Sequence, residues 1–316
     1  MYLLRTPILV ASRSAQVRTA VTHAPVTRSV VRRFVAGEAT TDALAAVARL
    51  QADGLRVTLD HLGEDTLDAA AAGRTVQGYL TLLTALDDAG LARGAEVSVK
   101  LSAVGQAVPP SGTSPHGPAL ALDGVRRIAE AAYGCGARVN LDVEDHTTID
   151  GMLAVLRDLR ADFPDVGVAM QAMLRRTPGD LADLTGPGSR VRLVKGAYAE
   201  PDSVSVGDAA AVDLAYVRCM RLLLAGQGYP MLGTHDPRMI EIAGSLVEEF
   251  GRTPDSFEHQ MLYGIRPDEQ LRLRAEGRQV RVYVPYGTDW YGYLTRRLAE
   301  RPANLLFFLR SLISRN

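Results

Sequence analysis

The sequence has few cysteines, no long apolar run and almost no net charge. Its two cysteines, Cys135 and Cys219, show neither the spacing of a metal site nor a disulfide framework, so a reducing cytosol fits and no metal centre is predicted. No apolar stretch reaches the ~18 residues that a membrane-spanning helix requires. The formal net charge of −1 gives no overall field that favours nucleic acid. We therefore expect neither a nucleic-acid partner nor a membrane span.

Acidic residues are absent before Glu38, although arginines occur throughout that stretch. An arginine-rich start without acids is compatible with an organelle transit peptide. The sequence of residues 29–35, however, is typical of the start of a folded domain. We therefore predict an N-terminal helical arm of residues 1–29, partly disordered, followed by one domain of residues 30–316.

Lysine is scarce as well, since only Lys100 and Lys195 occur among 35 basic residues. Each of them stands where a short apolar run of strand character stops. Lysine offers a compact ammonium that packs into a tight site and changes its pKa readily, which the planar fork of arginine does not. The two positions therefore indicate functional sites, with chance placement as the alternative.

Short β-branched runs alternate with helical patterns along most of the chain, and the 47% hydrophobic content is enough for a large core. The predicted strands are 56–60, 96–101, 137–143, 166–171, 190–195, 230–234, 256–260 and 280–284. The predicted helices are 41–52, 67–91, 122–133, 147–161, 178–184, 209–224, 238–250, 267–275, 289–300 and 303–313. Eight such units favour an α/β fold, the (β/α)8 barrel of the TIM type.

An open doubly wound sheet is the alternative architecture. It would call for a glycine-rich fingerprint after the first strand. The chain has Asp60-His61-Leu62-Gly63-Glu64 at that place instead. The barrel is therefore the favoured interpretation.

Polar side chains stand at the carboxyl ends of nearly all the predicted strands, where a barrel builds its active site. They include Asp60, Glu64, Lys100, Asp142, Glu144, Gln171, Arg192, Lys195, Thr234, His235, Asp236, Glu258, His259 and Tyr283. Lys100 and Asp142 should project inward from neighbouring strands as a pair. A mouth with balanced charges suits a zwitterionic small molecule, with a cofactor as second occupant.

The last predicted helix carries two adjacent arginines after a plausible N-cap at Asp289. Tyr293 precedes Arg296 and Arg297 by one helical turn, so its ring can lie beside both guanidinium groups. Such a pair over a barrel mouth can bind one carboxylate through bidentate hydrogen bonds. A solvated basic helix end is the alternative.

Several stretches, taken together, resemble the proline dehydrogenase family. They are RRFVAGE (32–38), LDHLGE (59–64), SVKLS (98–102), NLDVED (140–145), VRLVKGAY (191–198), GTHD (233–236) and YLTRRLAER (293–301). The resemblance runs from about residue 30 to the C-terminus in the family's order, and the size resembles the monofunctional bacterial form.

This resemblance implies a distorted (β/α)8 barrel with an extra N-terminal helical arm and a final helix over the mouth. It implies an FAD enzyme that oxidises L-proline to Δ1-pyrroline-5-carboxylate, the first step of proline catabolism. Electrons would pass to a membrane quinone, and a separate pyrroline-5-carboxylate dehydrogenase would act downstream. We expect a cytoplasmic protein with peripheral contact at the inner face of the membrane. The oligomeric state stays open.

The resemblance also implies roles for single residues. Asp142 and Arg192 match active-site positions. The substrate positions are Lys100, Arg296, Arg297, Tyr283, Tyr293 and Leu262, with Glu64 as a gate that pairs with the arginine helix. The FAD contacts are Val143, Gln171, Val194, Lys195, Gly196, Ala197, Thr234 and His235. Arg192 and Lys195 near the flavin would stabilise the negative charge of the reduced ring.

The substitution Arg296→Met tests the carboxylate assignment. It should raise the KM for proline by about tenfold or more, because a charge-assisted hydrogen bond is worth roughly 1.5–3 kcal/mol. Steady-state kinetics measure the effect, and an unchanged KM would remove the assignment.

Three other readings of the barrel stay open on the sequence. A Schiff-base aldolase would use Lys100 or Lys195 as nucleophile, and borohydride trapping would reveal it. A metal-dependent hydrolase or isomerase would use His235, His259 and nearby carboxylates, and chelators would inhibit it. A non-catalytic binding barrel would have to retain many charged side chains in a concave site, at a cost in desolvation free energy, without a reaction that uses them.

Overall fold

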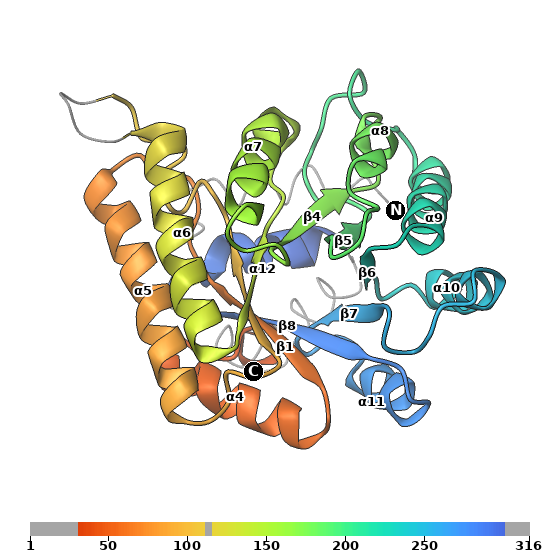
Figure 1. The fold of residues 1–316 in the computed structure, drawn as a ribbon, viewed down its shortest axis with the longest axis horizontal. Coiled ribbons are helices and arrows are strands. Elements are labelled where there is room, and N and C mark those ends of the chain that lie inside the picture. Colours follow the sequence, from red (N-terminus) through yellow and green to blue (C-terminus); the bar gives the residue numbers. More distant parts are fainter. Residues whose placement is uncertain (1–30, 111–115, 301–316) are drawn as a thin grey trace, which may run out of the picture.

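A computed structural model describes residues 31–110 and 116–300, except for the side chains of residues 296–300. Eight parallel strands form a closed barrel in chain order, and the pairing of the first strand with the last closes the ring (Figure 1). The strands are β1 Arg56–His61, β2 Ala95–Val99, β3 Arg138–Leu141, β4 Gly167–Gln171, β5 Arg190–Val194, β6 Tyr229–Gly233, β7 Glu258–Leu262 and β8 Val280–Tyr286. The predicted barrel is confirmed, and the open sheet is excluded.

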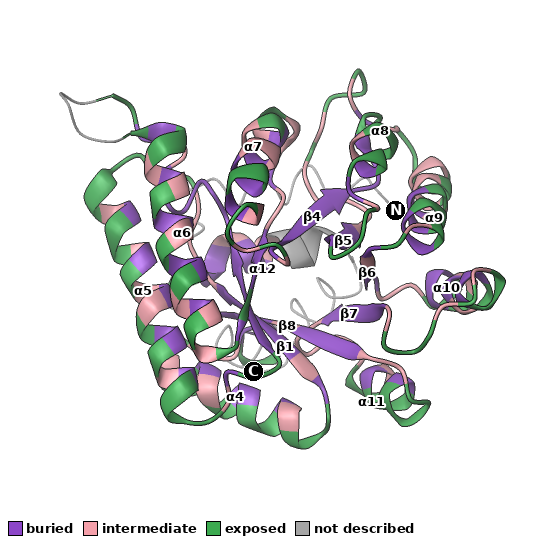
Figure 2. Ribbon diagram, in the orientation of Figure 1, coloured by how far each residue is buried: buried purple, intermediate pink, exposed green. Residues whose placement is uncertain are grey.

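Helices α4 to α11 surround the barrel on its outside, with buried residues toward the strands and exposed residues outward, and α12 lies across the ring of strands (Figure 2). They are α4 Thr40–Ala52, α5 Ala69–Asp88, α6 Gly117–Cys135, α7 Ile149–Arg160, α8 Thr177–Ala182, α9 Ala209–Ala225, α10 Pro237–Glu249, α11 Pro267–Ala275 and α12 Trp290–Glu300. A short 3-10 helix, His146–Thr148, precedes α7. Within the described ranges, no helix combines the length and the apolar character that a bilayer crossing needs.

Aspartate caps begin several of the helices that follow strands. Asp68 accepts the backbone N–H groups of Ala70 and Ala71 at the start of α5. Asp208 and Asp236 cap α9 and α10 in the same way. An N-cap of this kind contributes about 1 kcal/mol and fixes where the helix begins. The caps therefore help to set the loops at the carboxyl ends of the strands, where the candidate site lies.

The predicted boundaries differ from the observed ones by a few residues. The seventh strand is Glu258–Leu262, two residues later than predicted, and both lysines directly follow the last residue of a strand. Helix α12 begins at Trp290, directly after the predicted cap residue Asp289. The predicted arm of residues 1–29 and the predicted helix 303–313 lie outside the described residues, so the domain boundary stays a prediction.

Helix α12 crosses the ring of strands in Figure 1, and it follows the carboxyl end of β8 after a short turn. Trp290 and Leu294 of this helix pack in a small apolar cluster with Leu62, which follows β1. Phe34, from the chain segment before α4, belongs to the same cluster. The final helix therefore lies at the mouth of the barrel, as predicted.

Candidate active site

Arg192 of β5 lies at the centre of the barrel and is almost fully buried. Its guanidinium group has five N–H bonds. Five acceptors from other strands surround it: Gln260 at 2.6 Å, Asp142 at 2.6 Å, Ser98 at 2.8 Å, Glu96 at 3.0 Å and Thr58 at 3.4 Å. The ring of Tyr283 lies over the group, with 5.1 Å from Cζ to the ring centroid. Arg192 is therefore held in one orientation.

Asp142, directly after β3, joins three neighbours at the mouth. Arg192 donates to its Oδ1 at 2.6 Å, and the hydroxyl of Tyr283 donates to its Oδ2 at 2.5 Å. Lys100 Nζ lies 3.8 Å from Oδ2. Burial would raise the pKa of Asp142, but Arg192 and Lys100 outweigh it and lower the pKa below its usual value. Asp142 is therefore a fixed anion near neutral pH and a poor proton acceptor.

Lys100 has a nearer partner than the predicted one. Its ammonium donates to both oxygens of Asp60, at 2.7 and 2.8 Å, while Asp142 is farther away. Burial would lower the pKa of Lys100, but Asp60 and then Asp142 raise it above its usual value. A lysine that stays protonated is a poor nucleophile. This geometry argues against a Schiff-base aldolase at Lys100.

Lys195, after β5, is bound by carboxylates from two other elements. It donates to Asp236 at 2.9 Å and to Asp213 of α9. Arg238 also contacts both aspartates, which completes a ring of alternating charges. Lys195 and Arg238 thus share two carboxylates, and the predicted contact of Lys195 with a flavin stays a prediction.

The loop after β5 is anchored to the strand beside it. Gly196 has a φ of +118°, a conformation that side chains rarely adopt, and Met173 occupies the place where a Cβ would point. The N–H of Ala197 donates to Gln171 Oε1 at 3.3 Å, and Gln171 Nε2 donates to the carbonyl of Glu144 at 2.7 Å. The predicted residues Gln171, Gly196 and Ala197 thus form one continuous edge of the mouth.

Glu144, two residues beyond Asp142, is a buried carboxylate held by Ser102. It accepts the N–H of Ser102 at 3.1 Å and the hydroxyl at 2.5 Å. Burial raises the pKa of Glu144 above its usual value. The Ser102 hydroxyl also accepts the N–H of Asp65, which ties the loop carrying Glu64 to the same edge.

His235 and Leu262 lie together at the ends of β6 and β7. The N–H of Leu262 donates to His235 Nε2 at 2.7 Å, so this nitrogen is an acceptor and the proton of the neutral ring is on Nδ1. Arg266 holds the carbonyl of His235 at 2.7 Å. Thr234 accepts the N–H of Asp236 at 3.1 Å. The predicted residues Thr234, His235 and Leu262 are thus brought to one side of the mouth.

The inward-facing residues at the ends of the strands are less buried than those deeper in the barrel. Val194, Gly233, Leu262 and Tyr283 keep partial access, as do Asp142 and Val143 after β3. Gly233 lies beside Val194, and a Cβ on it would come within 2.9 Å of Val194 Cγ1. A side chain at position 233 would therefore collide with Val194, and the glycine leaves this part of the mouth to the apolar Val194.

The remaining predicted substrate residues are on α12 and on the loop after β1. Glu64 is half-buried, and it is among the carboxylates that raise the pKa of Lys100, after Asp60 and Asp142. Tyr293 is buried in the cluster with Leu62 and Trp290. The side chains of Arg296 and Arg297 lie outside the described residues, so their predicted contact with a carboxylate stays a prediction.

The histidines do not form a ligand set in the described part of the chain. Within residues 31–110 and 116–300, no three histidine, cysteine or carboxylate side chains are grouped as metal ligands. His259 is buried, and burial lowers its pKa to about 4. These observations do not favour the hydrolase reading of His235 and His259.

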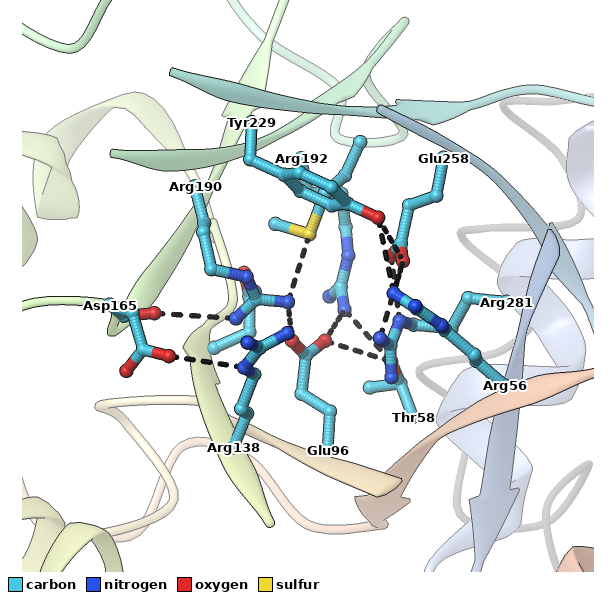
Figure 3. Close-up of polar contacts among 12 residues, drawn as sticks. Arg56, Thr58, Glu96, Arg138, Asp165, Arg190, Arg192, Tyr229, Glu258 and Arg281 are labelled. Carbon is cyan, nitrogen blue, oxygen red and sulfur yellow. Dashed lines mark hydrogen bonds and ion pairs between the residues drawn. The ribbon is translucent and has the colours of Figure 1, made fainter. Parts of the chain in front are cut away.

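A polar network that the sequence did not predict lies below the mouth, near the amino-terminal end of the barrel (Figure 3). Glu258, expected at the mouth, is the first residue of β7 and belongs to this network. Arg190 and Arg192 share Glu96 at 2.5 and 3.0 Å, and Arg281 pairs with Glu258 at 2.6 Å. Alternate residues in a strand face the same side. Because Arg190 and Arg192 alternate with buried Val191 and Leu193, this pattern could have revealed the charged interior.

Comparison with known proteins shows the family of this chain. Residues 43–310 match the family model described as proline dehydrogenase. The proline dehydrogenase of Deinococcus radiodurans is 41% identical over 287 residues, which is 90% of each chain. Proline dehydrogenase 1 of Bacillus subtilis strain 168 is 36% identical over 289 residues, which is 92% of each chain.

Solved structures support the fold. Proline utilization A from Bdellovibrio bacteriovorus, inactivated by N-propargylglycine, superposes with a TM-score of 0.76 at 23% identity over 86% of this chain. A mutant of proline utilization A from Bradyrhizobium japonicum gives 0.69 at 24% identity over 94% of this chain. This chain spans about a third of each of those longer chains. By the family match and the close relatives, the chain belongs to the proline dehydrogenase family.

Proposed function

We propose that this chain oxidises L-proline to Δ1-pyrroline-5-carboxylate with FAD as its cofactor. The observation that carries the proposal is the cluster of Lys100, Asp142, Arg192 and Tyr283 at the carboxyl ends of the strands. The family resemblance assigns active-site or substrate roles to these residues, and Lys100, Arg192 and Tyr283 all contact Asp142. The function of the relatives, proline dehydrogenase, supports the same substrate.

The lining of the mouth fits a flavin. Val194 and Gly233 offer an apolar surface without a bulky side chain at position 233, and the loop of Lys195, Gly196 and Ala197 follows Val194. Gln171, Thr234 and His235 add polar groups on the neighbouring strands. These residues, with Val143, would hold FAD. When bound, FAD supplies the acceptor for the hydride that leaves the ring carbon next to the proline nitrogen.

The other residues of the site would bind the proline carboxylate, contact the proline ring and orient the active-site groups. Lys100 provides a permanent cation for the proline carboxylate, together with Arg296 and Arg297 in the family pattern. Tyr283 and Tyr293 would wall the ring, and Leu262 would add an apolar contact. Glu64 would act as a gate over the substrate by pairing with the arginine helix. Because the pKa of Asp142 is lowered, Asp142 orients Arg192 and Tyr283 and does not act as a base.

The electrons have to leave the enzyme after each turnover. We propose a membrane quinone as the acceptor, so the chain would work in the cytoplasm and touch the inner face of the membrane. The product would pass to a separate pyrroline-5-carboxylate dehydrogenase. This places the reaction as the first step of proline catabolism.

The absorption spectrum of the purified protein tests the proposal. A flavin spectrum that bleaches when L-proline is added under anaerobic conditions is the expected result. D-proline, whose carboxylate projects from the opposite face of the ring, is the matched control and should bleach it far more slowly. Protein that binds no added FAD, or a flavin that proline leaves oxidised, would refute the function.

A further inference from the structure

Hydrogen-bond acceptors on both the mouth side and the closed side of the barrel hold the guanidinium group of Arg192. Asp142 accepts one N–H from the mouth side at 2.6 Å. Glu96 accepts another from the closed side at 3.0 Å, and Thr58 lies 3.4 Å from the same nitrogen. Arginine presents five N–H donors in a fixed planar fork, so acceptors on several sides restrict its orientation. The lower acceptors therefore contribute to where Arg192 points.

Among the acceptors on the closed side of Arg192, Glu96 carries a negative charge and contacts two arginines. Its side chain is fully buried on β2, and it lies between Arg190 at 2.5 Å and Arg192 at 3.0 Å (Figure 3). The hydroxyl of Thr58 donates to the same oxygen, Oε1, at 2.8 Å. One carboxylate thus balances two guanidinium groups that lie on the same strand, β5. Glu258 also faces two, Arg281 at 2.6 Å and Arg56 at 3.5 Å, but neither of them is Arg192.

The contacts form an unbroken chain of alternating charges along the barrel axis. It runs from Arg190 through Glu96, Arg192 and Asp142 to Lys100. In a buried interior, where screening is weak, the position of each charge depends on its neighbours. A substitution at Glu96 should therefore shift the position of Arg192 and, with it, that of Asp142.

We propose that Glu96 is a positioning residue that fixes Arg192 and, through it, Asp142 at the flavin side of the mouth. The proposal rests on the proposed function, because it assumes that Arg192 faces the bound flavin. Glu96 itself touches neither substrate nor cofactor, since it lies one layer below Arg192. Its effect should appear in turnover and in the flavin midpoint potential, and little in the KM for proline.

The first test uses Thr58, because Thr58→Val keeps the shape and charge of the interior and should fold. Losing the hydroxyl removes one donor to Glu96 and one acceptor of Arg192. It should lower kcat by about tenfold, the lower end of the scale for outer partners of metal ligands. The midpoint potential of the bound flavin should become more negative, because the cation is held less firmly. Thr58→Ser restores the hydroxyl and should restore both values.

The matched control is Ser189→Ala, which also removes a buried hydroxyl near the closed end. Ser189 accepts from Arg160 at 3.1 Å, and neither residue contacts Arg192. This variant should keep the kcat and the potential of the parent, even if its thermal midpoint falls as far as that of Thr58→Val. Equal changes in both variants would mean that lost stability alone explains them, which would overturn the proposal.

A second pair of variants tests Glu96 directly in the FAD-loaded enzyme. Glu96→Gln should lower kcat by about a hundredfold with KM within a few-fold of the parent, and Glu96→Asp should recover part of the loss. An unchanged kcat and potential in Glu96→Gln or in Thr58→Val would overturn the positioning role. With either of these results, proline would still bleach the flavin of the parent enzyme. Failure of the positioning role is therefore distinguishable from failure of the proposed function.

Discussion

Replacing Asp142 by asparagine is expected to lower the turnover of proline by about a hundredfold or more, the scale seen when a preorganised electrostatic group is removed. The carboxylate accepts from Arg192 at 2.6 Å and from Tyr283 at 2.5 Å, with Lys100 at 3.8 Å. The neutral amide keeps the size but loses the charge that balances two cations. The NH2 group of the asparagine would also face a donor, Arg192 or Tyr283, so at least one of these two hydrogen bonds would be lost.

Asp145→Asn is the matched control for this prediction. Asp145 lies three residues further along the same loop, where it caps the short helix by accepting the N–H of Thr147 at 2.8 Å. Asparagine caps helices as well as aspartate does, so this variant should turn over proline at close to the parental rate. Anaerobic reduction of the flavin by proline in a stopped-flow instrument measures both variants. A loss of less than threefold in Asp142→Asn would contradict the central place of this carboxylate.

The second large effect concerns stability. Glu258→Gln is expected to reduce the free energy of unfolding by about 3–5 kcal/mol, the scale seen when one partner of a buried ion pair is removed. Glu258 is fully buried and accepts from Arg281 at 2.6 and 3.2 Å. Glutamine would leave the fully buried guanidinium of Arg281 without its counter-ion, although one hydrogen bond can persist.

Glu249→Gln provides the comparison at the surface. Glu249 pairs with Arg221 in a bridge whose two side chains are about half exposed. Exposed pairs of this kind add little to stability, so the urea midpoint of this variant should stay near that of the parent. If Glu258→Gln unfolds at the same urea concentration as Glu249→Gln, the buried network is not a source of stability.

The buried carboxylates also set the response to acid. Burial would raise the pKa of Glu258, but the attraction of Arg281 outweighs it and lowers the pKa in the folded state. A carboxylate with a lowered folded pKa stabilises the protein above its unfolded pKa of about 4.3 and loses this effect as the pH falls. The stability difference between the parent and Glu258→Gln should therefore shrink below about pH 4. Urea midpoints measured from pH 7 to pH 3 check this, and a constant difference would contradict it.

The residue pattern was sufficient to predict the architecture of the barrel. Eight apolar runs separated by helical patterns predict parallel strands, and eight such units close into a ring. The same pattern put Lys100 and Lys195 at the carboxyl ends of two strands, and in the structure each directly follows the last residue of its strand. Family resemblance then pointed to Asp142 and Arg192, and these two form a direct ion pair.

Periodicity could not predict which charges meet across the barrel. Lys100 binds Asp60 more closely than the expected Asp142, and Lys195 is bound by Asp213 and Asp236. These partners come from other strands and helices, so their distances depend on strand register and on closure of the ring.

The sequence by itself determined the order of strands and helices, and it placed polar side chains at the mouth, because local periodicity and strand ends are properties of consecutive residues. Only the tertiary structure decided that the interior holds a continuous row of charges from Arg190 through Glu96 and Arg192 to Asp142. The physical reason is that β2, β3 and β5 bring these groups together only when the sheet curls into a closed barrel, where burial strengthens each attraction.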